Sequence, residues 1–216
     1  MTIIKTILIN ASPRKNWNTA QLLKSAQKGA ESVGAETEYV DLYDLNFTGC
    51  RSCLACKRKD AEKNKCYWKD DLAPLIDRIL HADSVIIGSP IYMGEPTAHF
   101  RALYERLAFC TLSYDEGEPS TFGGKVNMGF IYTMNAPKDY YEEKMRPALQ
   151  PAEYFYGLLL HGENQSMASC DTLQVSDYSK FNMSGFDEGD KKEHHASQFP
   201  VDLEAAFQLG ASVSKE

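Results

Sequence analysis

The sequence predicts an α/β protein with a five-stranded parallel sheet and helices on both faces. Short β-branched segments alternate with helical ones five times along the chain. One of these segments, residues 84–88, is Ser-Val-Ile-Ile-Gly, which is typical of a strand buried on both faces of a parallel sheet. The 216 residues are 43% apolar and 25% charged, enough for one substantial core. We therefore expect a single domain over residues 1–216 with right-handed crossovers between its strands.

The first half of the chain contains three of the expected strands and three of the helices. The β-branched segment 3–9 predicts a strand, and Ala and Leu residues at helical spacing predict a helix over 19–33. After a Gly34-Ala35 break, residues 36–41 predict a second strand. Asp70-Asp71 suits the positive end of a helix whose apolar face runs to residue 80. The strand at 84–88 and a helix over 97–110 follow.

The second half predicts two more strands and two more helices. Residues 125–132 indicate a fourth strand, and 140–160 a helix that Pro147 and Pro151 kink or divide. Residues 165–170 indicate a fifth strand, and 201–212 a last helix. The intervening segment 171–200 is long for a compact connection, so we expect it to lie along a neighbour or to be mobile. Together, residues 171–216 form an extended C-terminal segment.

Composition excludes several classes of function. The formal net charge of −7, with no sustained basic segment, argues against nucleic-acid and membrane partners. No apolar segment approaches the length of a membrane span, and the start of the chain lacks signal-peptide features. We therefore expect a cytoplasmic location. The six cysteines are then interpreted as thiols, metal ligands or redox groups rather than a disulfide framework.

The segment 12–19 lies between the first predicted strand and the first predicted helix. A helix N-terminus presents free N–H groups and a positive dipole end, which favour anions. Ser12, Asn18 and Thr19 add hydroxyl and amide donors, and Arg14 adds a planar charged fork. The segment is therefore a candidate phosphate site. The alternative is that Asn18 or Thr19 only caps the helix and that Arg14 is solvated.

A second loop, residues 89–96, follows the buried third strand. Because ligands of such sheets bind beyond the carboxyl ends of the strands, where strand order reverses, the loops after strands one, three and four should meet. Tyr92 and Met93 supply flat or polarisable surface, and Gly94 permits close approach. The first loop matches neither a dinucleotide fingerprint nor a Walker A motif. A phosphate at one end and a planar ring at the other fit a mononucleotide flavin.

These segments resemble the flavodoxin-like NAD(P)H-dependent FMN reductase family, in the branch that includes iron–sulfur flavoproteins. The likeness covers roughly residues 3–175. It implies a flavodoxin-like fold, bound FMN with NAD(P)H as electron donor, and a homodimer or homotetramer. The segment 12–19 is similar to the family's phosphate loop, 90–94 to its isoalloxazine loop, and 133–135 to a third loop. The candidate cofactor-binding residues are Ser12, Arg14, Asn18, Thr19, Ala20, Ser89, Pro90, Ile91, Tyr92, Met93, Gly94, Thr133, Met134 and Asn135.

A cysteine-bearing loop is expected at about residues 47–69. Its thiols Cys50, Cys53 and Cys56 stand three residues apart, and Cys66 follows. A close trio resembles the ligand sets of [4Fe–4S] clusters more than the separated pairs of zinc sites. The resemblance implies a cluster that exchanges electrons with the flavin, although the spacing to Cys66 is longer than in the iron–sulfur flavoproteins. Free or disulfide-forming thiols and zinc remain alternatives. Cys110 and Cys170 are expected to be buried small hydrophobes.

The leading hypothesis is an FMN-dependent oxidoreductase that passes electrons from NAD(P)H to a second acceptor, such as a flavin, a quinone or a protein. The cofactor carries the chemistry, and no protein residue is predicted to be catalytic. One alternative is an iron–sulfur flavoprotein that carries electrons from ferredoxin. Another is a thiol-sensing or nucleotide-binding regulatory module.

Overall fold

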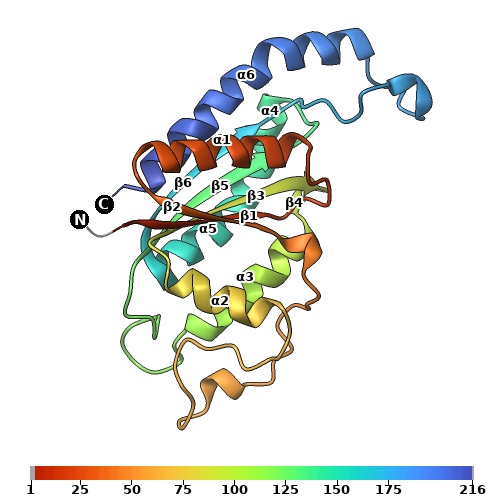
Figure 1. The fold of residues 1–216 in the computed structure, drawn as a ribbon. Coiled ribbons are helices and arrows are strands. Elements are labelled where there is room, and N and C mark those ends of the chain that lie inside the picture. Colours follow the sequence, from red (N-terminus) through yellow and green to blue (C-terminus); the bar gives the residue numbers. More distant parts are fainter. Residues whose placement is uncertain (1–2, 216) are drawn as a thin grey trace.

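The structure, a computed structural model, describes residues 3–215. Its central sheet contains β1 (Lys5–Asn10), β2 (Glu36–Asp41), β3 (Ser84–Tyr92), β5 (Val126–Thr133) and β6 (His161–Ser169). The strand order is β2-β1-β3-β5-β6, and every neighbouring pair is parallel (Figure 1). The predicted five-stranded parallel sheet is confirmed. Strand order reverses between β1 and β3, where Asn10 lies opposite Gly88.

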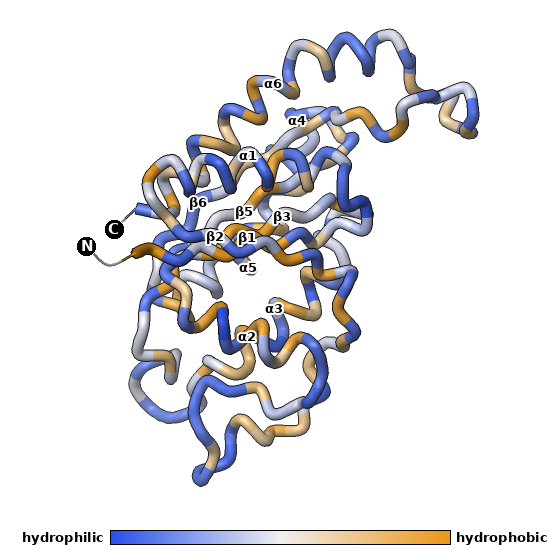
Figure 2. The backbone as a smooth tube through the Cα atoms, viewed as in Figure 1, coloured by the Kyte–Doolittle hydropathy of each residue, from blue (hydrophilic) through white to orange (hydrophobic). Residues whose placement is uncertain are grey.

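Helices cover both faces of this sheet (Figure 1). On one face α1 (Asn18–Ser32) and α6 (Glu188–Val213) pack with residues such as Leu8, Ile86 and Ile131. On the other face α2 (Leu72–Leu80), α3 (Ala98–Thr111) and α5 (Arg146–Leu160) enclose the larger apolar cluster. The central strands are largely hydrophobic, as their burial between two helix layers requires (Figure 2).

The third strand is longer than the sequence predicts, because its end forms a hairpin. Residues 89–92, expected to be loop, continue β3, and β4 (Glu95–Pro96) pairs antiparallel with Ile91 and Tyr92. The connection is Met93-Gly94, with φ of 53° and 87°. Positive φ at both central residues is the geometry of a type I′ hairpin turn, and glycine adopts it without steric cost.

The predicted helix over 140–160 is divided, but the division precedes Pro147, and Pro151 lies inside the continuous helix α5 instead of dividing it. A single turn, α4 (Lys138–Tyr140), leads into a π-helical segment, Tyr141–Met145, and α5 follows. Pro147 lies in the first turn of α5, where its missing N–H breaks no hydrogen bond. The strand β6 then begins at His161, four residues earlier than predicted.

The C-terminal helix corrects the sequence prediction most. It begins at Glu188, thirteen residues before the predicted start, so residues 188–200 are helical rather than an extended connection. The Asp187 carboxylate caps this helix, accepting a hydrogen bond from the Asp190 N–H at 2.9 Å. Pro200 does not end the helix, because Phe199 and Ala206 anchor both sides of it in the core. Its hydrophilic first turns project beyond the sheet (Figures 1 and 2).

Within residues 3–215 no helix combines the length and the apolar character that crossing a membrane requires.

Candidate functional site

The three predicted loops meet at the carboxyl edge of the sheet around a cavity of about 220 Å³. Ten of the fourteen candidate cofactor-binding residues line it: Ser12, Arg14, Asn18, Thr19, Pro90, Ile91, Tyr92, Thr133, Met134 and Asn135. Their side chains divide by chemistry, because the first loop contributes polar groups and the second contributes apolar and aromatic surface. The cavity is thus polar at the α1 end and suited to a flat ring beyond it.

The first turn of α1 is uncapped. Its N-cap residue is Trp17, and no side chain accepts a hydrogen bond there. The Asn18 amide instead donates to the Leu173 carbonyl at 2.9 Å, and the Thr19 hydroxyl lies 2.7 Å from that of Thr133. The alternative that Asn18 or Thr19 only caps α1 is therefore wrong. A helix N-terminus whose N–H groups lack side-chain partners and border a cavity is a favourable place for an anion.

A fourth segment, residues 172–174, also lines the cavity, and sequence reasoning did not find it. Its Leu173 carbonyl accepts hydrogen bonds from Trp17 Nε1 at 3.1 Å and from Asn18, and its Gln174 carbonyl accepts one from Arg14. Arg14 is therefore engaged rather than simply solvated. The segment follows β6, so the rule that ligands bind beyond the carboxyl ends of strands could have predicted it had the last strand been included.

Two further lining residues were not among the candidates named from the sequence, although the first belongs to the third predicted loop. Ala136 continues the third loop, and Met145 comes from the π-helical segment before α5.

Four candidate residues lie outside the cavity lining. Ala20 lies in the first turn of α1 and is fully buried. The Ser89 hydroxyl accepts a hydrogen bond from the Thr97 N–H at 3.1 Å and so fixes the start of α3. Met93 and Gly94 form the hairpin turn, and the Met93 side chain is fully exposed. These positions shape the loops rather than face the cavity.

The four cysteines of the 47–69 loop line one small cavity together with Arg106 from α3. All four are free thiols, and Cys53 is exposed whereas the other three are half-buried. Burial raises the pKa of the Cys56 thiol. Among residues 3–215, no three His, Cys, Asp or Glu side chains stand close enough to hold a single metal ion.

The backbone of this loop turns sharply between the cysteines. Ser52 and Leu54, which alternate with them, have φ of 50° and 56°. This left-handed conformation is costly for residues other than glycine, and it concentrates at functional sites. Between Cys50 and Cys66 the only regular structure is one 3₁₀ turn, Ala55–Lys57.

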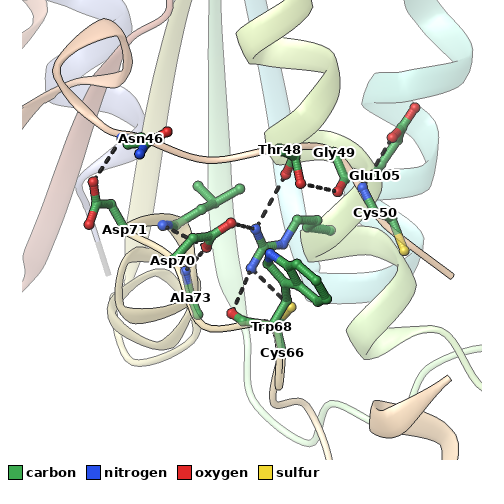
Figure 3. Close-up of polar contacts among 12 residues, drawn as sticks. Asn46, Thr48, Gly49, Cys50, Cys66, Trp68, Asp70, Asp71, Ala73 and Glu105 are labelled. Carbon is green, nitrogen blue, oxygen red and sulfur yellow. Dashed lines mark hydrogen bonds and ion pairs between the residues drawn. The ribbon is translucent and has the colours of Figure 1, made fainter. Parts of the chain in front are cut away.

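Arg106 is the centre of a polar network next to these thiols. Figure 3 shows its partners Thr48, Cys66, Trp68 and Asp70. Its side chain is 1% exposed and forms an ion pair with Asp70. The guanidinium also donates to Cys66 Sγ at 3.1 Å and to the carbonyls of Thr48 and Trp68, each at 3.3 Å. Burial alone would lower the pKa of Arg106, but its hydrogen bonds to Asp70 and Cys66 raise it, so the group stays charged. Sequence reasoning did not single out Arg106, because its partners are 36–58 residues away along the chain.

Cys110 should resist alkylation in the folded protein. It is 2% exposed, and burial raises its pKa to about 12, so almost no thiolate exists near neutral pH. We expect mass spectrometry to find iodoacetamide on Cys110 only after denaturation. Rapid labelling of the native protein would contradict this buried position. Cys170, also expected to be buried, lies one residue beyond β6 and is only half-buried.

Comparisons with known proteins identify the family of this chain. The family model "NADPH-dependent FMN reductase" matches residues 4–152. An iron-sulfur flavoprotein of Methanocaldococcus jannaschii is 35% identical over 103 residues, 48% of this chain and 51% of that protein. Another, from Methanosarcina thermophila, is 25% identical over 156 residues, 72% of this chain and 76% of that protein. The match thus spans about half the length of the first relative.

Solved structures share the fold. An NAD(P)H:quinone oxidoreductase from Methanothermobacter marburgensis superposes with a TM-score of 0.71 over 100% of this chain and 99% of that one, at 15% identity. The azoreductase AzrA gives a TM-score of 0.65 over 96% and 99%, at 13% identity. The family model covers more than half of the chain, including all three loops. The chain therefore belongs to the NADPH-dependent FMN reductase family.

Proposed function

We propose that this protein is an FMN-dependent oxidoreductase that passes electrons from NAD(P)H to a second acceptor, such as a flavin or a quinone. The observation that carries this proposal is the uncapped N-terminus of α1 at the polar end of a cavity whose other loops supply apolar and aromatic surface. Membership in the FMN reductase family supports it. Bound FMN would supply the redox chemistry by accepting hydride from nicotinamide and giving up electrons to the acceptor.

The chain's own residues would bind and orient the cofactor. The phosphate would take hydrogen bonds from Ser12, Asn18, Thr19 and the first N–H groups of α1, with Arg14 supplying charge. Arg14 and Asn18 already donate to carbonyl oxygens of residues 173 and 174, so the phosphate would replace one set of acceptors with another.

The ring would lie against the second and third loops. Pro90 and Ile91 restrict solvent on one side, and Met134 is almost fully buried on the other. Burial raises the pKa of Tyr92, so its phenol stays protonated and can pack against a neutral ring. No acid–base pair is required of the protein in this scheme.

Purified protein should contain FMN and should bleach when reduced. We expect a flavin absorption spectrum, release of FMN rather than FAD on denaturation, and anaerobic loss of the visible absorbance on adding NADPH or NADH. A protein that cannot be loaded with FMN would refute the proposal. A flavin that dithionite reduces but neither nicotinamide reduces would refute the NAD(P)H half and favour an electron carrier.

A second candidate function is an electron carrier with a [4Fe–4S] cluster at Cys50, Cys53, Cys56 and Cys66, reduced by ferredoxin. The observation that favours it is that all four thiols line one cavity beside a buried Arg106 whose Nε–H has no hydrogen-bond partner within residues 3–215. The free space there is only about 20 Å³, so this loop, which is largely without regular structure, must widen to admit a cluster. The relatives named iron-sulfur flavoproteins add support.

Iron and acid-labile sulfide in anaerobically purified protein decide between a cluster and simple thiols. About four of each per chain would support the cluster, and their absence after anaerobic reconstitution would refute it. Reduction by ferredoxin but not by NAD(P)H would favour the carrier.

We also propose that residues 1–216 form one cytoplasmic domain that assembles as a homodimer or homotetramer. The exposed Tyr92 and Met93 beside the candidate site support an intersubunit contact. Light scattering would test the assembly, and a monomer at micromolar concentration would contradict it.

A further inference from the structure

The cysteine cavity contains a buried cation that the oxidoreductase scheme does not use. The Arg106 side chain lines this cavity at 1% exposure, and within residues 3–215 its Nε–H has no partner. Leaving a buried charged donor unsatisfied is costly, so an acceptor is expected there. The guanidinium of Arg106 already donates a hydrogen bond to Cys66 Sγ. We therefore expect the missing acceptor of the Nε–H to be a sulfur atom as well.

We propose that Arg106 is a positioning residue that holds Cys66 as the fourth ligand of an iron–sulfur cluster and raises the reduction potential of that cluster. This inference rests on the proposed cluster. It resolves the long spacing between Cys56 and Cys66, because the guanidinium binds both Cys66 Sγ and the Trp68 carbonyl and so fixes the returning chain at the cavity that the other three thiols line.

Electrostatics gives the direction of the effect. The cluster gains one electron on reduction, so a nearby positive charge and hydrogen bonds to sulfur stabilise the reduced form. The Asp70 carboxylate, paired with Arg106, weakens this effect but does not reverse it, because the Arg106 guanidinium is the group that contacts Cys66. Arg51 also lines the cavity, but it is exposed, so solvent screens its charge.

The helix α3 connects this cation to the candidate flavin site. The hydroxyl of its N-cap residue Thr97 donates to the Ala11 carbonyl at 2.7 Å, and the Thr97 N–H donates to the Ser89 hydroxyl at 3.1 Å, so the helix start is bound to the first two loops. Arg106 lies nine residues further on, about 14 Å along a helix that rises about 1.5 Å per residue. The helix thus fixes the position of Arg106 relative to the candidate flavin site.

The test measures the cluster potential in variants of the full-length, anaerobically reconstituted protein. Because Arg106→Gln alone would leave Asp70 unpaired, it is combined with Asp70→Asn, and Arg106→Lys keeps the charge but loses the fork. The control is Arg51→Gln, which removes a charge from the exposed side of the same cavity. Titration with dithionite, which supplies the electron, is followed by EPR of the reduced cluster, and FMN content and circular dichroism report folding.

We expect the double variant to shift the reduction equilibrium at least tenfold toward the oxidised cluster, which is about 59 mV for one electron. Arg106→Lys should shift it less, and Arg51→Gln least. Loss of iron from a folded double variant would support the positioning role. In that case the effect of Arg106 on the cluster potential is measured in the Arg106→Lys variant. A loaded double variant with the wild-type potential would overturn the inference alone. Wild-type protein without iron and sulfide would overturn the proposed cluster as well.

Discussion

Replacing Arg14 with alanine is expected to weaken FMN binding about tenfold to a hundredfold, as loss of a charged hydrogen bond costs about 1.5–3 kcal/mol. Arg14 lines the candidate cavity beside the uncapped end of α1, and its present acceptor is only a backbone carbonyl. The dissociation constant can be measured by quenching of free FMN fluorescence on titration with apoprotein. The stability of the apoprotein should change little, because the Arg14 side chain is exposed.

Lys15→Ala is the matched control. Lys15 is the adjacent exposed cation, but it pairs with Asp44 and does not line the cavity. Lys15→Ala removes the same charge as Arg14→Ala. A purely long-range electrostatic effect on FMN affinity would therefore be equal in the two variants. An unchanged FMN affinity in Arg14→Ala, or equal losses in the two variants, would contradict the placement of the phosphate at Arg14.

Adding one methyl group at Gly210 is expected to destabilise the fold by about 3 kcal/mol, the upper end for an overpacked site. A Cβ at this position would lie 1.9 Å from the Ala26 carbonyl oxygen, and one at Gly29 would lie 1.9 Å from the Phe207 carbonyl oxygen. Both contacts are with backbone, so no side-chain rotation relieves them. The helices α1 and α6 must separate, and α1 also carries the candidate phosphate site.

Thermal unfolding measures this effect. For a chain of this length we expect Gly210→Ala to lower Tm by roughly 6–12 °C. Gly123→Ala is the control, because nothing lies within 4 Å of a Cβ there. Equal Tm values for the two variants would show that α1 and α6 do not pack as closely as described.

Local sequence patterns were sufficient to predict the sheet and the edge at which the candidate loops meet around a cavity. The alternation of apolar strands and amphipathic helices leaves few topologies, and the rule for strand ends then places the loops after β1, β3 and β5 together. Most candidate residues in those loops do line one cavity. These features could be predicted because the periodicity of buried residues and the residues that start a helix are both visible within a few positions of the sequence.

Contacts between distant segments decided the rest. The Leu173 carbonyl meets Asn18 across 155 residues, and Arg106 meets Cys66 across 40. No periodicity encodes such pairs, because they depend on how loops close after the sheet has formed. The hairpin that turns Met93 away from the cavity likewise depends on pairing of β3 with β4.

The chain's own pattern thus determined an α/β sheet with a candidate phosphate loop at the start of α1, because helix and strand signals are local. Tertiary packing alone decided that Asn18 and Thr19 leave α1 uncapped, since their side chains find partners on residues 173 and 133. It also decided that a buried guanidinium faces the cysteines, because α3 presents Arg106 to a loop that the sequence describes only as irregular.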